Sequence, residues 1–584
     1  MKQASVIIQS LMCAALVCNA QIEAFNLGKT MYVPRSQSVN AARELVGWYE
    51  GINRYDVGDY YGSFSATPEF TRTFQSRHIA RYFFGTDVLK FSGSRVPDRS
   101  PEDILADYFG LPTDYKSTVL VTPCAENALL DFDWYCGLDA WYPGLYFRIH
   151  APLVYTIWGL HLEEYQKFSG MNNYPAGYMG PELIERSAMN CTVLQSLAGG
   201  VSFGDYQGLR YGKVGCDKHA FGLSEIQLAF GWNMVNSDHY HFGINARGSI
   251  PTGTRPNGTY IFEPIIGNGH HGELGIGFTG HAMTLYCNDE WMIGIYGDAN
   301  LTHLFSTRQR RSFDFLKHGS GSRYILMESM ITPAEEGFTV NGIQAQYQYG
   351  GEIIPAINKS TLDCWVSIPV QLDLAGMLVW EHNNINVEVG YNLWMRTGEK
   401  LQSRDCFPND RFAFKGDAQV YGFLPEYNTP IPLNATQSYP AAGGVSPRVS
   451  LEAGQGKGSA SQIFANTNAD NAGNAAFKGT QLNQSYAPDG IIDTGLEDAD
   501  ITHVEGSNPP VLLNDSSIED LSALCGSAST NKFFMHVGYT FVDCRRSKPY
   551  IGLGGEIELD GASTRNAVNS FSQWGIWLKG GVSY

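Results

Sequence analysis

The sequence predicts an all-β fold, a transmembrane antiparallel up-and-down β-barrel of about 14 strands, with about 12 or about 16 strands also allowed. Two observations predict it. Long segments alternate apolar or small residues with polar ones, which is typical of β-strands. The apolar side of these segments carries no charged residue, although 17% of the chain is charged. Lipid requires such a face together with closed backbone hydrogen bonding, which a barrel provides.

The clearest alternation runs from residue 364 to residue 380 and resumes after a turn at 382–384. These strands are longer than the roughly 5 to 6 residues usual in soluble sheets, and their length fits the about 9 to 11 tilted residues that cross a bilayer together with extensions at the ends. A large soluble β-sandwich or propeller is the alternative fold. The face assigned to lipid consists of Cys364, Val366, Ile368, Val370, Leu372, Leu374, Gly376, Leu378 and Trp380.

The same pattern predicts the other strands in chain order. Tight turns and long connections alternate between them, as in barrels that have short periplasmic turns and long extracellular loops. The tight turns are expected at 141–144, 236–238, 288–289 and 382–384, and the long loops at 159–221, 253–272, 304–361 and 423–530. The strands are expected at 130–138, 145–157, 226–234, 240–250, 274–286, 291–301, 533–541, 551–559 and 574–584.

Strand parity sets the total number of strands. One or three strands must precede residue 127, with candidates at 60–74 and 78–92. An even number must lie between 400 and 530, where 412–420 and 509–513 are the candidates. With the eleven alternating segments above, these constraints allow 12, 14 or 16 strands, and we expect about 14.

The N-terminal region predicts export. Lys2, an apolar run at 11–17 and small residues at 18–20 indicate a cleaved signal peptide, residues 1–20, with a lipoprotein cysteine at position 18 as the alternative. Residues 21–57 are expected to form a periplasmic segment or a plug, with a short helix near 39–48, and residues 58–584 the barrel. Residues 454–480 are low in complexity and indicate a disordered outer loop.

The polar side of the strands is expected to line the lumen, where acidic residues outnumber basic ones. Carboxylates around an aqueous pore favour cations. Three arginines in the loop 304–361, Arg308, Arg310 and Arg311, are candidates for a constriction, with lipid-phosphate binding or solvation as the alternatives. The pore-lining candidates are Asp131, Asp133, Arg148, Glu225, Arg247, Asp298, Asp373, Glu388, Arg396, Glu556, Glu558 and Lys579.

Other classes of function receive little support. The net charge of -18 argues against nucleic acid as a partner. His270 and His271 are adjacent and cannot easily converge on one ion, and we expect no enzyme, cofactor or metal. Eleven cysteines are present. Disulfides are expected among Cys124, Cys191, Cys216, Cys406 and Cys525.

With its signal peptide, paired strands and terminal aromatic Tyr584, the chain resembles bacterial outer-membrane porins. Its cysteine content is similar to that of chlamydial-type major outer-membrane porins. The resemblance implies an outer-membrane location, lipid contact, recognition by the barrel assembly machinery, and passive diffusion of small hydrophilic solutes or cations, with a homo-oligomer possible. The alternative function is a plugged barrel acting as a structural surface protein or adhesin.

Overall fold

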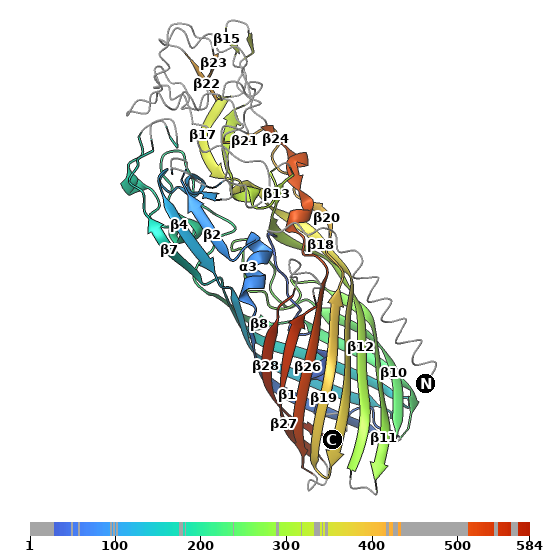
Figure 1. Ribbon diagram of the computed structural model, residues 1–584. Coiled ribbons are helices and arrows are strands. Elements are labelled where there is room, and N and C mark those ends of the chain that lie inside the picture. The colour runs from blue at the N-terminus through green and yellow to red at the C-terminus, as the bar shows by residue number, and fades with distance from the viewer. Residues whose placement is uncertain are drawn as a thin grey trace.

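The computed structural model shows an elongated molecule, with a β-barrel at one end and a part built from the long connections at the other (Figure 1). The expected signal peptide and the segment 454–480 lie outside the described residues. The structure describes residues 29–47, 51–55, 59–93, 96, 100, 103–174, 179–180, 183–237, 239–287, 291–316, 318–331, 339–340, 343–344, 348–415, 420–423, 430–433, 512–541, 547–561 and 570–584.

The main sheet contains 14 strands, and 12 of them close into an antiparallel ring. The ring closes where β1 pairs β28 and where β12 pairs β18. The predicted fold class is confirmed. The ring strands are β1 (Tyr60–Thr73), β5 (Cys124–Leu138), β6 (Leu145–Gly159), β9 (Ile226–Asn236), β10 (Tyr240–Ile250), β11 (Glu273–Cys287), β12 (Trp291–Ser312), β18 (Thr361–His382), β19 (Ile385–Arg396), β26 (Ala528–Thr540), β27 (Lys548–Asp560) and β28 (Gln573–Ser583).

The two remaining strands of the sheet extend existing ring strands. β8 (Lys218–Leu223) pairs the upper half of β6, whose lower half pairs β9. β20 (Lys400–Arg404) pairs the upper end of β18. The number 14 therefore describes the whole sheet, and the ring has two strands fewer.

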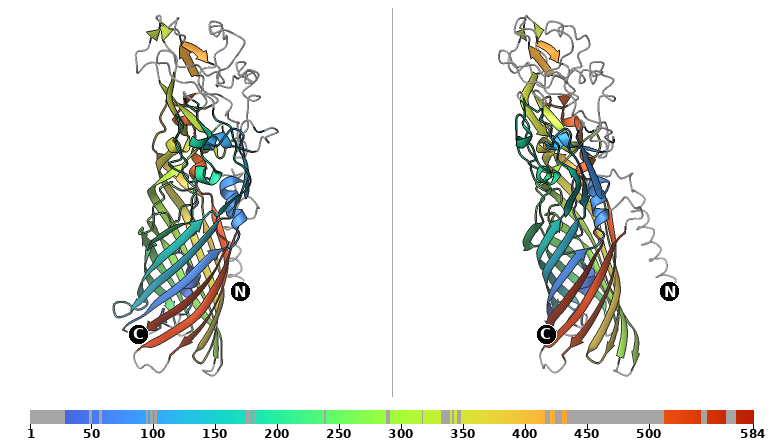
Figure 2. Two further views of the ribbon diagram at one scale, coloured as in Figure 1. Left: turned by 90° about the vertical axis from the view of Figure 1, so that its left-hand side faces the viewer. Right: turned by 60° about the vertical axis from the view of Figure 1, so that its left-hand side comes forward.

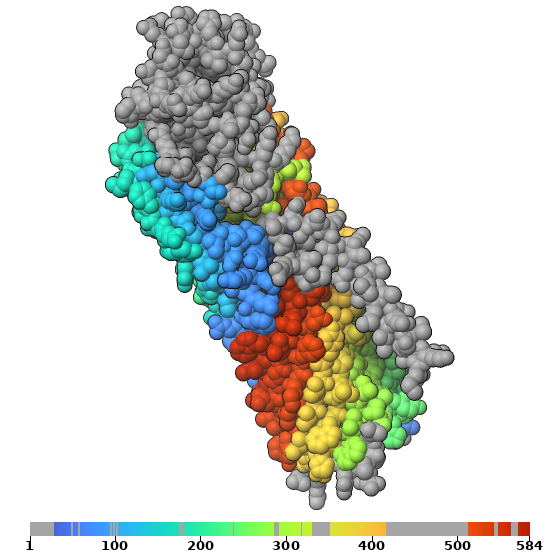
Figure 3. Space-filling model, viewed as in Figure 1, coloured from blue at the N-terminus to red at the C-terminus, as the bar shows by residue number. Residues whose placement is uncertain are grey.

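The outer face of the ring is apolar, as the alternation predicts. Phe64, Trp134, Leu378, Val389 and Ile576 are exposed on different strands, while their neighbours in the chain are buried or half-buried. We call this exposed apolar face the outer belt. Figure 3 shows the red C-terminal strands and the yellow strands lying directly against one another in this wall. A closed ring with an apolar exterior meets both requirements of lipid.

The predicted lipid-facing series is wrong at the upper end of β18. Cys364 and Ile368 are 0% and 1% exposed, whereas Trp365 is 46% exposed. The register between β12 and β18 shifts on both sides of Leu304, which pairs Ile368. Such irregularities add a residue to one strand and exchange its two faces. Above this point, the even-numbered residues of β18 point inward.

The tight turns at 141–144 and 382–384 lie at one end of the ring, at the bottom of Figure 1, where the C-terminus also lies, and the turn expected at 288–289 falls outside the described residues. There the backbone N–H of Gly62 donates to the carbonyl of Tyr584 at 3.0 Å. Short turns mark the periplasmic end in barrels of this kind. Among the described residues, no helix is long and apolar enough to cross a membrane.

The candidate strands at 78–92, 412–420 and 509–513 do not belong to the ring. Residues 76–84, expected as part of a strand at 78–92, form helix α3 (Ser76–Phe84), which ends at Gly85 with a φ of 74°. Its buried residues Ile79, Tyr82 and Phe83 recur at helical spacing, which strand periodicity cannot accommodate. Residues 412–414 and 512–513 are indeed strands, β21 (Phe412–Phe414) and β24 (Leu512–Leu513), but they belong to a separate four-stranded sheet.

The long connections form an extracellular part above the ring (Figure 2). They share one apolar core that includes Phe91, Tyr108, Phe313, Ile354 and Phe414. Its strands are β2 (Val88–Ser92), β3 (Ile104–Leu105), β4 (Lys116–Val121), β7 (Leu162–Phe168), β13 (Asp314–Phe315), β14 (Leu326–Ile331), β15 (Thr339–Val340), β16 (Ile343–Gln344), β17 (Gln348–Pro355), β22 (Val420–Phe423), β23 (Pro430–Leu433) and β25 (Ile518–Glu519), and its helices are α4 (Val193–Leu197), α6 (Ile357–Ser360), η2 (Ala106–Phe109), η3 (Arg186–Ala188), η4 (Ser322–Tyr324), η10 (Asp515–Ser517) and η11 (Asp520–Ala523).

Candidate functional site in the barrel lumen

Residues 29–47, which we call the N-terminal segment, run inside the ring. At the extracellular end, the backbone N–H of Lys29 donates to the carbonyl of Tyr82 at 3.0 Å. Near the periplasmic end, the N–H of Asn53 donates to the hydroxyl of Tyr135 at 3.2 Å. The chain therefore descends the length of the lumen before β1 begins at Tyr60.

The segment contains one short helix, α2 (Ala41–Leu45), which begins where the Asn40 side chain accepts a hydrogen bond from the N–H of Arg43. Its apolar side, with Ala42 and Leu45, packs against lumen-facing residues of β12, β18, β26 and β28. Gly47 adopts a φ of 78°, and its N–H donates to Glu388 on β19 at 3.0 Å. A glycine suits this left-handed conformation because it has no Cβ.

Two arginines of the N-terminal segment are each held by a pair of carboxylates from the ring. Arg35 donates to Asp373 and Glu558, both at 2.9 Å. Arg43 donates to Glu69 at 2.5 Å and to Asp131 at 2.7 Å. All of these side chains are buried. A guanidinium group with two buried carboxylates satisfies the charge that burial would otherwise make costly.

Glu44 of the same segment makes the reverse arrangement, one carboxylate between two arginines. Arg247 lies 2.9 Å and Arg148 3.2 Å from its carboxylate. Arg148 also reaches Asp133 at 3.0 Å. The segment therefore bonds acids and bases on several sides of the lumen.

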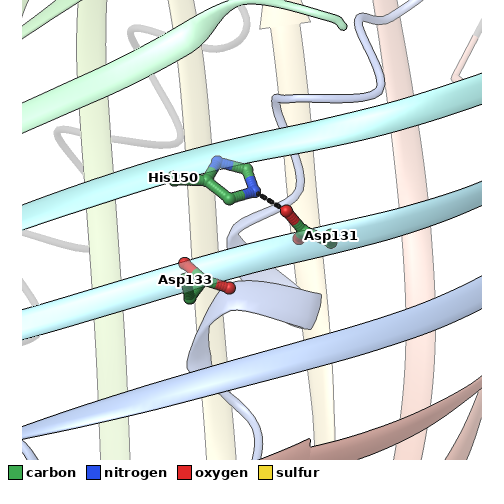
Figure 4. Close-up of side chains that lie close together, drawn as sticks. All are labelled: Asp131, Asp133 and His150. Atoms are coloured by element: carbon green, nitrogen blue, oxygen red, sulfur yellow. Dashed lines mark ion pairs between the residues drawn. The ribbon is translucent and has the colours of Figure 1, made fainter.

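Beside Glu44, Asp131 and Asp133 on β5 lie close to His150 on β6 (Figure 4). His150 Nε2 lies 2.6 Å from Asp131. These three residues have the spacing of a cation site, since their ligand atoms all lie within 4.8 Å of one another. Arg43 and Arg148 already bond the two aspartates, so guanidinium groups supply the positive charge there.

The structure places the predicted pore-lining residues on the inner side of the ring, and most of them contact the N-terminal segment. Lys579 donates to the carbonyl of Arg43 at 2.9 Å, and Arg396 donates to the carbonyl of Val33 at 2.8 Å. Glu225 accepts from Ser36 at 2.5 Å. Asn40 donates to Glu556 at 3.3 Å, while Asp298 lies 4.0 Å from Arg148.

Sequence reasoning missed five charged residues of this site: Arg35, Arg43 and Glu44 of the segment, and Glu69 and Lys532 on the ring. Lys532 on β26 lies 2.7 Å from Glu556. The inward parity of β1 and β26 could have identified Glu69 and Lys532. The strand pattern holds no signal for the residues of the segment, because they lie outside any strand.

The three arginines expected in a loop lie on β12 instead, because that strand continues above the ring to Ser312. Arg308 and Arg310 bond Asp363 at 2.5 Å and 2.8 Å, with half-exposed side chains. Arg311 is fully buried and bonds Glu399 at 2.5 Å. Burial acts to raise the pKa of Glu399, but Arg311 lowers it to about 2. The register shift turns Arg308 and Arg310 away from the lumen, so these two do not form a constriction.

A cavity lies between the N-terminal segment and the strands β1, β5, β26 and β27. It has an empty volume of about 540 Å³, including the part that is open to solvent. Arg35, Arg43, Glu69, Asn127 and Lys532 are among the residues that line it. Two of its buried acceptor atoms, Glu69 Oε1 and Asn127 Oδ1, have no hydrogen-bond partner.

The disulfides expected between the extracellular connections are not formed in the structure. Cys124, Cys191, Cys216, Cys406 and Cys525 are all free thiols. Cys525 is buried, while Cys191, Cys216 and Cys406 are exposed. Cys136, on the outer face, is partly buried.

The closed ring, the outer belt and the charged, buried lumen decide the class. The protein has the architecture of a membrane-spanning β-barrel of the outer-membrane type. No protein-family model and no curated protein matches the chain.

Solved outer-membrane barrels are weakly similar to it. An outer-membrane channel from Pseudomonas putida F1 has a TM-score of 0.29 and 8% identity, over 91% of this chain and 100% of that one. A FadL homologue of Pseudomonas aeruginosa has a TM-score of 0.25 and 6% identity, over 96% and 98%. The β-domain of the Bordetella autotransporter BrkA has a TM-score of 0.23 and 7% identity, over 90% and 99%. The architecture is established by the closed ring, the apolar outer belt and the buried, charged lumen.

Proposed function

We propose that this barrel is a channel for the passive diffusion of small hydrophilic solutes or ions, with a preference for cations. In the described state, the N-terminal segment occupies the lumen as a plug. The observation that carries the proposal is the way in which Arg35 and Arg43 are held. Buried ion pairs hold the segment to the ring together with the apolar side of α2, and the ion pairs can be exchanged for water or solute without unfolding a strand.

The charge of the ring supports the preference for cations. Arg35 and Arg43 bring positive charge to the ring, while Glu44 brings one negative charge. Without the segment, the inner side of the ring would keep an excess of carboxylates, which lowers the barrier for positive ions. The acids are Glu69, Asp131, Asp133, Glu225, Glu273, Asp298, Asp373, Glu388, Glu556 and Glu558, and the bases are Arg148, Arg247, Arg396, Lys532 and Lys579.

Binding chemistry, and not catalysis, explains the lumen best. Arginines and a lysine engage Asp131, Asp373, Glu556 and Glu558, and Ser36 and Ser224 donate to Glu225. We therefore propose no enzymatic activity. Partners follow from the class: lipid at the outer belt, the barrel assembly machinery through the C-terminal strand, and a second copy in a homo-oligomer.

A structural surface protein is the second candidate, because the extracellular part lies over the mouth of the ring. Tyr32 of the N-terminal segment stacks on Phe571 with ring centroids 4.7 Å apart, and Trp158 lies 4.7 Å from Phe262. These rings belong to the apolar core of the extracellular part. A lumen that stays closed under this core would leave the barrel as an anchor or adhesin.

Conductance in planar bilayers tests the two candidates. We expect rare openings from the refolded full chain and frequent, cation-selective openings from the double variant Arg35→Gln/Arg43→Gln. The matched control is Arg308→Gln/Arg310→Gln, which removes two arginines outside the lumen and leaves the openings unchanged. A silent double variant that migrates as folded, heat-modifiable protein would reject the channel and favour the structural role.

A further inference from the structure

The lumen binds two guanidinium groups of the N-terminal segment in the same way, each between two carboxylates. Arg35 lies between Asp373 and Glu558, and Arg43 lies between Glu69 and Asp131, each with two carboxylates within 2.9 Å. The carboxylates belong to four different strands, β18, β27, β1 and β5. The ring is thus built to recognise planar cations that donate several N–H bonds.

The cavity beside Arg43 is lined by two buried oxygen acceptors that have no hydrogen-bond partner. Glu69 uses Oε2 for Arg43, and its Oε1 has no hydrogen-bond partner. Asn127 donates its amide N–H to Thr71 at 2.9 Å, and its Oδ1 has no partner either. Both side chains line the cavity and are only 5% and 7% exposed. A buried acceptor without a donor is costly, so this pair favours a ligand that supplies N–H groups.

The other charges around the cavity are paired with one another. Lys532 lies 2.7 Å from Glu556 and 3.5 Å from Glu558. Arg35 bonds Glu558, and Gln573 donates to the same carboxylate at 2.8 Å. A ligand would therefore meet free acceptors at Glu69 and Asn127, and the remaining wall would not repel its charge.

We propose that this cavity is a binding site for a small organic cation with a guanidinium or primary ammonium group. The cation donates N–H bonds to Glu69 Oε1 and Asn127 Oδ1 and shares the Glu69 carboxylate with Arg43, which keeps its bond to Oε2. This site rests on the proposed function in one respect, since the channel is the route by which the cation reaches the cavity. Binding is measured separately from conductance.

Isothermal titration calorimetry of the full chain, refolded in detergent, tests the site with methylguanidinium as the probe. Tetramethylammonium is the matched control ion, since it has the same charge and no N–H donor. We expect methylguanidinium to bind and tetramethylammonium not to bind. We expect Asn127→Ala to weaken binding about tenfold, the effect of losing one hydrogen bond to a charged group. Glu69→Gln should also weaken binding, because it removes the negative charge that faces the cation. Gln371→Ala removes another buried lumen amide outside the cavity lining and should leave binding unchanged.

A gain-of-function variant protects the test from folding failure. Asn127→Asp keeps the acceptor and adds a charge, so it should tighten methylguanidinium binding. Equal binding of the two ions, or unchanged affinity in both Asn127 variants, would overturn the site. Binding without any conductance would retain the site and reject the channel, and conductance without binding would do the opposite.

Discussion

Arg43 in the N-terminal segment donates from Nε to Asp131 on β5 across 2.7 Å, and neither side chain is more than 2% exposed. The two residues are 88 positions apart in the chain. With Glu69 as the second acceptor, this contact fixes the segment against two neighbouring strands of the ring.

Replacing Arg43 should release the N-terminal segment. In Arg43→Gln, Asp131 and Glu69 lose their shared partner while they remain buried, which costs about 3–5 kcal/mol in such pairs. We expect amide hydrogen exchange in residues 39–47 to become much faster, as measured by mass spectrometry. Arg72→Gln is the control, because the exposed Arg72 pairs Glu126 at 3.2 Å outside the lumen, and such pairs contribute about 0–1 kcal/mol. Equal protection in the two variants would show that Arg43 does not hold the segment.

The Arg311–Glu399 pair should make the extracellular part acid-sensitive at very low pH. Burial acts to raise the pKa of Glu399, but Arg311 outweighs it and lowers this pKa from the ordinary value of 4.5 to about 2. A lowered carboxyl pKa gives stability that is present above pH 4.5 and is lost as the pH falls through 2. We expect limited proteolysis of the wild type to accelerate below about pH 4. The protease should cleave the Glu399→Gln variant faster than the wild type at neutral pH, and this rate should no longer rise in acid. A variant with the same pH dependence of cleavage as the wild type would show that Glu399 is not the acid-sensitive group.

Glu328 should have the opposite effect. Burial raises its pKa to about 8, despite the opposing influence of Lys415. A raised carboxyl pKa gives stability that is fully present below pH 4.5 and is lost as the pH rises through 8, by at most about 1.4 kcal/mol per unit. We expect hydrogen-exchange protection of β14, corrected for intrinsic rates, to fall between pH 5 and pH 8 in the wild type and to stay constant in Glu328→Gln. Glu352→Gln on the paired strand β17 changes an exposed carboxylate and should keep the wild-type dependence.

A charge in the outer belt should destabilise the barrel in lipid. Leu378 on β18 and Leu316 in the extracellular part are both 54% exposed, so they form a matched pair. Leu378→Arg should lower the free energy of unfolding by about 2–4 kcal/mol if it lies near the bilayer midplane. Leu316→Arg should change it little, because its arginine meets water. Urea titration in lipid vesicles measures both, and equal effects would contradict the membrane position of the belt.

The period-two alternation by itself determined the class of fold, the position of most ring strands and the inward side of the predicted pore-lining residues. It could do so because lipid and water impose opposite demands on the two faces of every strand. The pattern failed at Cys364 and Ile368, since a register shift exchanges faces without leaving a mark in the local sequence. It also misjudged residues 76–84, where aromatic residues suit a strand and a buried helix equally well.

Only the tertiary structure decided what the charges of the lumen do. The excess of acids on the strands is visible in the sequence, but the positions that pair Arg35 with Glu558 are 523 residues apart. Such a pair depends on ring closure, strand order and the path of the N-terminal segment through the lumen. Strand periodicity encodes none of these, because it records which medium each side chain faces and not which distant residue it meets.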